Sequence, residues 1–206
     1  MKFLAHIFAA AILLLSSCNK GKADFTVKGT ISDDTFSGAL TGASVELYEV
    51  EAGGSASNLI GSATIGSDGA YSFTFPRNKA ESYLLKVRKD NYFEQDFTIP
   101  FSELTIEEDN VRNYSSTAKS WARLRFITTD PTAQLKYVKQ QGKIDCANCC
   151  GTEENFLNGV VDTEIICPND GNTTYSYHYW LLGTSISGEK NANTTAFDTV
   201  DIVLNY

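Results

Sequence analysis

Apolar and polar residues alternate along most of the chain from Phe25 onward. In each alternating stretch the apolar side chains occupy every second position, which is the period of a β-strand with one buried face. Glycine, aspartate, serine and asparagine separate the stretches, and these residues favour tight turns. The residues expected to face the core of the first half are Phe25, Val27, Ile31, Val45, Leu47, Tyr71, Phe73, Phe75, Tyr83, Leu85, Val87, Phe93, Phe97 and Ile99.

The alternation continues in the second half of the chain, from about Ser120. Strands are expected at residues 120–126, around Leu135 and Tyr137, and in the closing stretch "FDTVDIVLNY". No stretch of ten or more residues shows apolar positions at helical spacing, and short strands with turns between them favour sandwiches over βαβ units. The predicted fold class is therefore all-β, with two consecutive β-sandwich domains.

The polar segment "TIEEDNVRNYSSTAK" marks the division between the two halves. We expect a first sandwich at residues 25–106, a linker at 107–119 and a second sandwich with a cysteine-rich insertion at 120–206. The acidic run at residues 107–109 lacks the glycine-spaced loop of a calcium site, so it is interpreted as part of a solvated linker.

Two motifs in the first half, "LTGASVELYE" and "GSDGAYSFTF", stand in an order and spacing that resemble the carboxypeptidase regulatory-like and Cna B-type group of prealbumin-like β-sandwiches. In the second motif, residues 67–69 are expected to form a hairpin turn. The resemblance implies a fold and not an activity. Cna B-type domains can carry an isopeptide bond, but Lys28 lies too early on its strand. Lys28 and Glu46 are therefore expected to be solvated strand residues.

The N-terminal stretch "MKFLAHIFAAAILLLSSC" combines a cation at Lys2, an apolar run at residues 7–15 and a cysteine after two small residues. The apolar run is too short to cross a bilayer, which takes about 20 residues. The pattern resembles the lipobox of a bacterial lipoprotein signal. The resemblance implies that residues 1–17 are removed, that Cys18 is acylated and that residues 18–24 form a tether.

The same signal predicts a location in the cell envelope, where the lipid holds the protein to a membrane. We expect the outer membrane, and the sequence leaves its periplasmic or surface face undecided. The net charge of the whole chain is −8. Because lysine and arginine are not clustered in any run, nucleic acid is not expected as a partner.

Four cysteines besides Cys18 lie in the second half: Cys146, Cys149, Cys150 and Cys167. An even number in an oxidising compartment predicts two disulfides, with one of the adjacent cysteines bonded to Cys167 and the other to Cys146. A zinc site with Asp170 as fourth ligand is an alternative, but structural zinc prefers a full thiolate or histidine set. A redox role lacks the expected βαβ context. We therefore expect no metal and no cofactor.

The aromatic stretch "TYSYHYWL" places its tyrosines on one face of a predicted strand and His178 with Trp180 on the other. The tyrosines are expected in the core. His178 and Trp180 are the candidate binding residues, because an exposed aromatic pair can form a stacking platform for a sugar or a peptide.

Candidate catalytic residues are not found in the sequence. His178 is the only histidine outside the predicted signal, and no nucleophile elbow lies near it. We expect a non-catalytic binding or assembly module of the envelope, with a glycan or an envelope protein as partner, and a binding surface around Trp180 and residues 146–167. The alternatives are an accessory hydrolase of the envelope and a purely structural spacer.

The first testable prediction concerns Cys18. Because the residue follows a lipobox, it should be the first residue of the mature protein and should carry acyl chains on its sulfur and its amine. Mass spectrometry of protein from its native host should find the acylated N-terminal peptide. An intact signal, or an unmodified N-terminus at another residue, would contradict the prediction.

Overall fold

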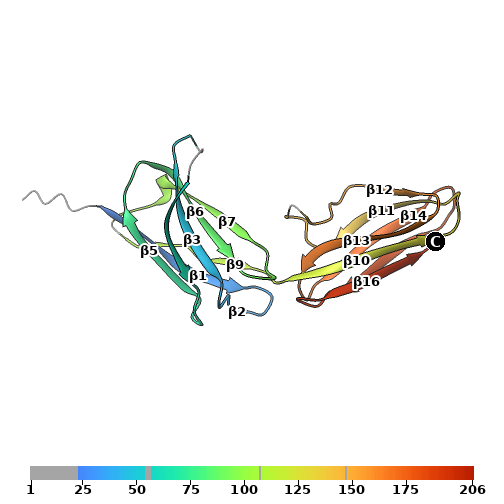
Figure 1. Cartoon of the computed structure of the whole chain (residues 1–206), viewed down its shortest axis with the longest axis horizontal. Coiled ribbons are helices and arrows are strands. Elements are labelled where there is room, and N and C mark those ends of the chain that lie inside the picture. Colours follow the sequence, from blue (N-terminus) through green and yellow to red (C-terminus); the bar gives the residue numbers. More distant parts are fainter. Residues whose placement is uncertain (1–22, 54–56, 107, 147) are drawn as a thin grey trace, which may run out of the picture.

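The computed structural model describes residues 23–53, 57–106, 108–146 and 148–206. These residues form two β-sandwiches that follow one another along the long axis of the molecule (Figure 1). The expected signal, Cys18 and most of the tether lie outside the described residues. Within the described residues, no helix is long and apolar enough to span a membrane.

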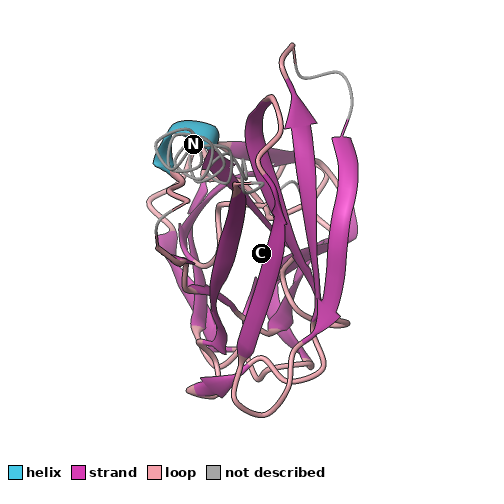
Figure 2. Ribbon diagram, turned by 90° about the vertical axis from the view of Figure 1, so that its left-hand side faces the viewer, coloured by secondary structure: helices cyan, strands magenta, loops and turns pink. Residues whose placement is uncertain are grey.

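Two sheets form the first sandwich. One has the order β2-β1-β5, with β8 and β9 pairing in parallel with β1, and the other has the order β4-β3-β6-β7. Figure 2 shows the short helical turn η1 at one end of this sandwich. The elements are β1 (Asp24–Asp33), β2 (Gly38–Ala39), β3 (Ser44–Glu51), β4 (Ser57–Thr64), β5 (Ala70–Pro76), β6 (Ala80–Arg88), β7 (Gln95–Pro100), η1 (Phe101–Glu103), β8 (Asn110–Val111) and β9 (Tyr114–Ser116).

The core of the first sandwich contains the apolar residues that the alternation predicts. Phe25, Val27 and Ile31 on β1 face Val45 and Leu47 on β3, and all five are almost fully buried. Of the fourteen predicted core residues, only Phe97 is partly exposed. The all-β prediction and the assignment of the buried faces are confirmed.

The turn at residues 67–69 is present as predicted, but it does not connect two strands that pair with each other. Gly69 has a φ of +74°, and the Asp68 side chain accepts a hydrogen bond from the backbone N–H of Ala70 at 3.1 Å. However, β4 pairs with β3 and β5 pairs with β1, so the turn leads from one sheet to the other. The hairpin prediction is wrong, because the turn residues fix a change of direction and not the partner strand.

The segment expected as a linker belongs largely to the first sandwich. Residues 110–116 contain β8 and β9, both of which pair with β1. The connection between these two strands passes so close to β1 that a Cβ on Gly29 would lie 1.7 Å from the carbonyl oxygen of Arg112. The prediction failed because strands of two or three residues are too short to show an alternating pattern.

The second sandwich has one sheet of order β13-β10-β16 and another of order β12-β11-β14-β15. Ala122, Leu124 and Phe126 on β10 pack between the sheets against Ile202 and Leu204 of the closing strand. The strands are β10 (Lys119–Thr128), β11 (Gln134–Gln141), β12 (Asn155–Asn158), β13 (Val161–Asp170), β14 (Thr174–Leu181), β15 (Ser187–Asn193) and β16 (Thr199–Asn205).

Only two residues, Thr117 and Ala118, separate the last strand of the first domain from the first strand of the second. Ala118 is fully buried. Its N–H donates to the hydroxyl of Thr35 in the first domain at 2.9 Å, and its carbonyl accepts from the N–H of Gly171 in the second at 2.8 Å. Each domain therefore binds one of the two backbone polar groups of Ala118, and this restricts rotation between the domains.

An aromatic contact adds to this junction. Phe36 of the first domain stacks on Phe197 of the second with ring centroids 5.8 Å apart, and Tyr92 approaches Phe197 at 5.6 Å. Phe197 has a φ of +69°, which is unfavourable for a bulky side chain. Such a conformation persists only where the surroundings enforce it. The Phe197 N–H donates to the carbonyl of Lys119 on β10 at 2.7 Å, so a bond within the second domain helps to hold this conformation while the ring contacts the first domain.

The close approach at Gly29 generates the second prediction. Gly29→Ala should lower the free energy of unfolding by about 3 kcal/mol, because the new methyl group collides with backbone that cannot move without breaking the pairing of β8 and β9. Gly38→Ala is the matched control, since nothing lies within 4 Å of its Cβ position. Urea unfolding of both variants provides the measurement. Equal stabilities would contradict the packing of residues 110–116 on β1.

Candidate functional site

Trp180 and His178 lie on the outer face of the sheet that contains β14. Tyr175 and Tyr177 alternate with them and are buried in the core, with exposures of 1% and 0%. Burial raises the pKa of both phenols, because the charged form would lose its hydration. The predicted core placement of these two tyrosines is confirmed, and Tyr179 packs against the same core while partly exposed.

A row of side chains crosses this outer face from strand to strand. Phe156 on β12 pairs with Lys136 on β11, and Lys136 pairs with Trp180 on β14. Directly paired residues of antiparallel strands point to the same side of the sheet. The Lys136 ammonium lies 4.3 Å from the centre of the Trp180 ring. The centre of the His178 ring also lies 4.3 Å from the centre of the Trp180 ring. We call Lys136, Phe156, His178 and Trp180 the Trp180 face.

The Trp180 face offers apolar rings with little uncompensated charge. Lys136 forms an ion pair with Glu154 at 3.1 Å, so the cation between the two rings is already partnered. Phe156 is 52% exposed, which is high for a large apolar side chain. The sequence analysis did not single out Phe156 or Lys136. The alternation of Phe156 with Leu157 shows that one of them faces outward, but only the register of the strands brings Phe156 beside Trp180.

The cysteines form two disulfides, Cys146–Cys149 and Cys150–Cys167. One of the adjacent cysteines is thus bonded to Cys167 and the other to Cys146, as predicted. Cys167 is fully buried on β13, whereas Cys146 and Cys149 lie in the loop that follows β11. The second disulfide therefore ties this loop to the opposite sheet of the sandwich.

Polar contacts hold the same loop, residues 142–150, which we call the cysteine loop. The ammonium of Lys139, almost fully buried, donates to the carbonyl oxygens of Lys143 and Cys150 at the two ends of the loop. Burial lowers the pKa of Lys139, and the nearby carboxylates of Glu153 and Asp170 act in the opposite direction. Together with Cys150–Cys167, these bonds fix both ends of the cysteine loop.

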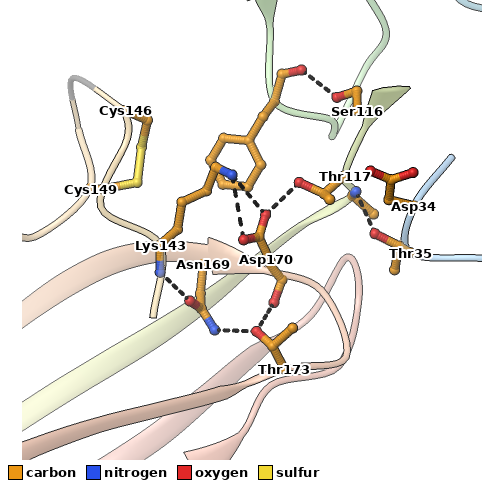
Figure 3. A network of polar contacts seen from close by, with 12 residues as sticks. Asp34, Thr35, Ser116, Thr117, Lys143, Cys146, Cys149, Asn169, Asp170 and Thr173 are labelled. Atoms are coloured by element: carbon orange, nitrogen blue, oxygen red, sulfur yellow. Dashed lines mark hydrogen bonds and ion pairs between the residues drawn. A yellow bond between two sulfur atoms is a disulfide. The ribbon is translucent and has the colours of Figure 1, made fainter. Parts of the chain in front are cut away.

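The residues considered for zinc have other partners. Cys146, Cys149 and Cys167 are in disulfides, while the Asp170 carboxylate accepts a hydrogen bond from Thr117 and pairs with Lys143 at 3.1 Å (Figure 3). Asp170 therefore contributes to the domain junction. Within the described residues, no group of three or more histidine, cysteine or carboxylate side chains is arranged to hold a metal ion.

Lys28 and Glu46 both lie at the surface of the first domain. Lys28 forms an ion pair with Asp109, with both side chains close to half exposed. The Glu46 carboxylate accepts a hydrogen bond from the Tyr48 hydroxyl at 2.7 Å, which raises the pKa of Tyr48. The two residues have separate partners, in accordance with their interpretation as solvated strand residues.

The structure brings together only part of the predicted binding surface. β12 lies within residues 146–167 and adjoins the Trp180 face through Phe156. The cysteines of the loop lie elsewhere, because Trp180 pairs near the start of β11 and the cysteine loop begins after its end. At about 3.3 Å per residue, the five residues from Lys136 to Gln141 separate the two features by roughly 17 Å.

Comparison with known proteins identifies no matching family model and no matching curated protein. Among solved structures, the shaft pilin spaA from Lactobacillus rhamnosus GG is similar over 88% of this chain and 97% of its own, with 12% identity and a TM-score of 0.40. A streptococcal ancillary pilin is similar over 89% and 63%, with 14% identity and a TM-score of 0.37. A DUF3823 family protein from Bacteroides ovatus ATCC 8483 is similar over 84% and 98%, with 13% identity and a TM-score of 0.30.

The third prediction concerns the order in which the disulfides are reduced. Cys146–Cys149 should react first in a titration with a mild reductant. The other disulfide, Cys150–Cys167, should react later because Cys167 is fully buried and shielded from the reductant. Alkylation and peptide mapping at each step should find two labelled cysteines, Cys146 and Cys149, before four. Labelling of Cys167 first would contradict the packing of the second disulfide.

Proposed function

We propose that the chain is a non-catalytic, lipid-anchored module of the cell envelope that binds a partner protein through the Trp180 face. The observation that carries this proposal is the row of Phe156, Lys136 and Trp180 across the outer face of the sheet. The lipobox at Cys18 supports the anchoring, and the resemblance of the first domain to Cna B-type sandwiches is compatible with a binding or assembly role.

The shape and chemistry of the Trp180 face favour a protein over a small ligand. Two aromatic side chains stand on the outer face of the sheet, and the Lys136 ammonium between them is paired with Glu154. Aromatic anchors surrounded by satisfied polar groups are typical of the energetically important centres of protein interfaces. A partner that covers this surface would bury Phe156 without leaving the Lys136 ammonium unpaired.

The hydrolase alternative depends on His178. Its ring packs on Trp180 at a centroid distance of 4.3 Å, and no hydroxyl or thiol among the described residues forms a hydrogen bond with it. A nucleophile must lie within hydrogen-bond reach of its base. The spacer alternative gains support from the rigid junction at Ala118, and it differs from our proposal in assigning no role to the Trp180 face.

The fourth prediction tests the Trp180 face. A photoreactive amino acid at position 156 should crosslink one specific envelope protein in the native host, because Phe156 stands half exposed at the edge of the face. Trp180→Ala should then weaken binding of the purified partner by about 2 kcal/mol or more, as removal of a central aromatic anchor does. Leu59→Ala is the control, since Leu59 is equally exposed but lies on β4 of the first domain.

Thermal unfolding of each variant separates binding from stability. Phe156→Ala provides a second substitution on an edge strand, where loss of an exposed ring does not open the core. Unchanged partner affinity in both folded variants would contradict the proposal and favour the spacer. If no protein is crosslinked and both substitutions abolish binding to an isolated envelope glycan, the partner of the Trp180 face is a glycan and not a protein.

A further inference from the structure

We infer that the groove between the two domains is a binding site for an uncharged saccharide. This junction groove is separate from the Trp180 face and does not depend on its function. It has a volume of about 490 Å³, which lies within the usual range for ligand pockets, and such pockets often form at domain interfaces. Its lining residues are Phe93, Glu94, Lys119, Trp121, Asp145, Cys146, Asn148 and Pro168.

Three parts of the molecule form the walls of the junction groove. Phe93 and Glu94 come from the connection between β6 and β7 in the first domain. Lys119 and Trp121 come from the start of β10 in the second domain, and Asp145 belongs to the cysteine loop. The groove therefore exists only while the two domains keep their relative position.

Trp121 supplies a partly exposed aromatic side chain to the junction groove. The residue points outward from β10 and is half-buried, and Pro168 pairs with it on the neighbouring strand. The Phe93 ring, by contrast, has Lys119 and Lys143 over it, and the Trp180 ring on the opposite sheet has Lys136 and His178. In the described part of the chain, no cation or second ring lies against the Trp121 indole.

The polar groups of the junction groove are balanced in charge and in hydrogen bonding. Lys119 and Asp145 carry opposite charges, and Glu94 is already paired with Arg88 at 3.1 Å. Asn148 adds an amide that can both donate and accept. Saccharide hydroxyl groups also donate and accept, and the C–H face of a sugar ring can pack on an indole. An uncharged saccharide therefore matches these walls better than an anion or a cation.

The groove is held in a fixed shape before any ligand binds. Lys143 of the cysteine loop pairs with Asp170 and lies over the Phe93 ring at 4.6 Å, so it links the loop to the first domain (Figure 3). Phe93 in turn donates its N–H to the carbonyl of Thr117 in the connection at 3.0 Å. A preformed site loses less entropy on binding, which favours a rigid groove as the place for a weakly interacting sugar.

The fifth prediction tests the groove on the complete mature chain. Soluble oligosaccharides of glucose, mannose, xylose or N-acetylglucosamine serve as probes in calorimetry and tryptophan fluorescence. We expect at least one of them to bind, and we expect Trp121→Ala to weaken that binding about thirtyfold or more. Asp145→Asn should weaken it about tenfold through loss of a charged hydrogen bond while leaving the fold intact, because Asp145 is exposed.

Two control variants make the result specific to the groove. Trp180→Ala removes the other tryptophan, which lies on the opposite sheet, and should leave saccharide affinity unchanged. Asp162→Asn removes an exposed carboxylate of β13 outside the groove and should also have no effect. The inference is overturned if the wild-type chain binds none of the probes. It is also overturned if Trp121→Ala and Asp145→Asn bind them as the wild type does, or if a peptide occupies the groove in their place.

Discussion

The backbone of Ala118 is the constraint on which the arrangement of the molecule depends. Its N–H is bound by the first domain and its carbonyl by the second, and the residue is fully buried between them. A flexible tether would let the two sandwiches tumble independently, but a two-residue connection with both polar groups engaged cannot. The stacking of Phe36 on Phe197 and the contact of Lys143 with Phe93 follow from that fixed position.

The rigid junction gives each part of the second domain a definite place. The cysteine loop reaches back toward the first domain and closes one side of the junction groove, whereas the Trp180 face belongs to another sheet and remains open. The described chain begins at the end of the first domain that lies away from the second (Figure 1). A lipid at Cys18 would therefore hold both surfaces of the second domain at a distance from the membrane.

The sequence was most informative where burial follows a simple period. Alternation identified the faces of β1, β3, β5 and β6, and the even number of cysteines in an oxidising compartment indicated two disulfides. It was least informative where tertiary contact decides the structure. β8 and β9 are too short for a pattern and depend on the missing side chain of Gly29. Phe156 and Trp121 became candidate binding residues only through strand register and domain contact, because alternation encodes neither.

The most direct measurement of the central claim is a set of amide residual dipolar couplings from both domains in one weakly aligned sample of the mature protein. If Ala118 and its partners hold the domains as one body, a single alignment tensor will fit the couplings of both sandwiches with the orientation described here. Two tensors of different magnitude or direction would show that the domains move independently. That result would contradict the rigid junction and, with it, the preformed groove.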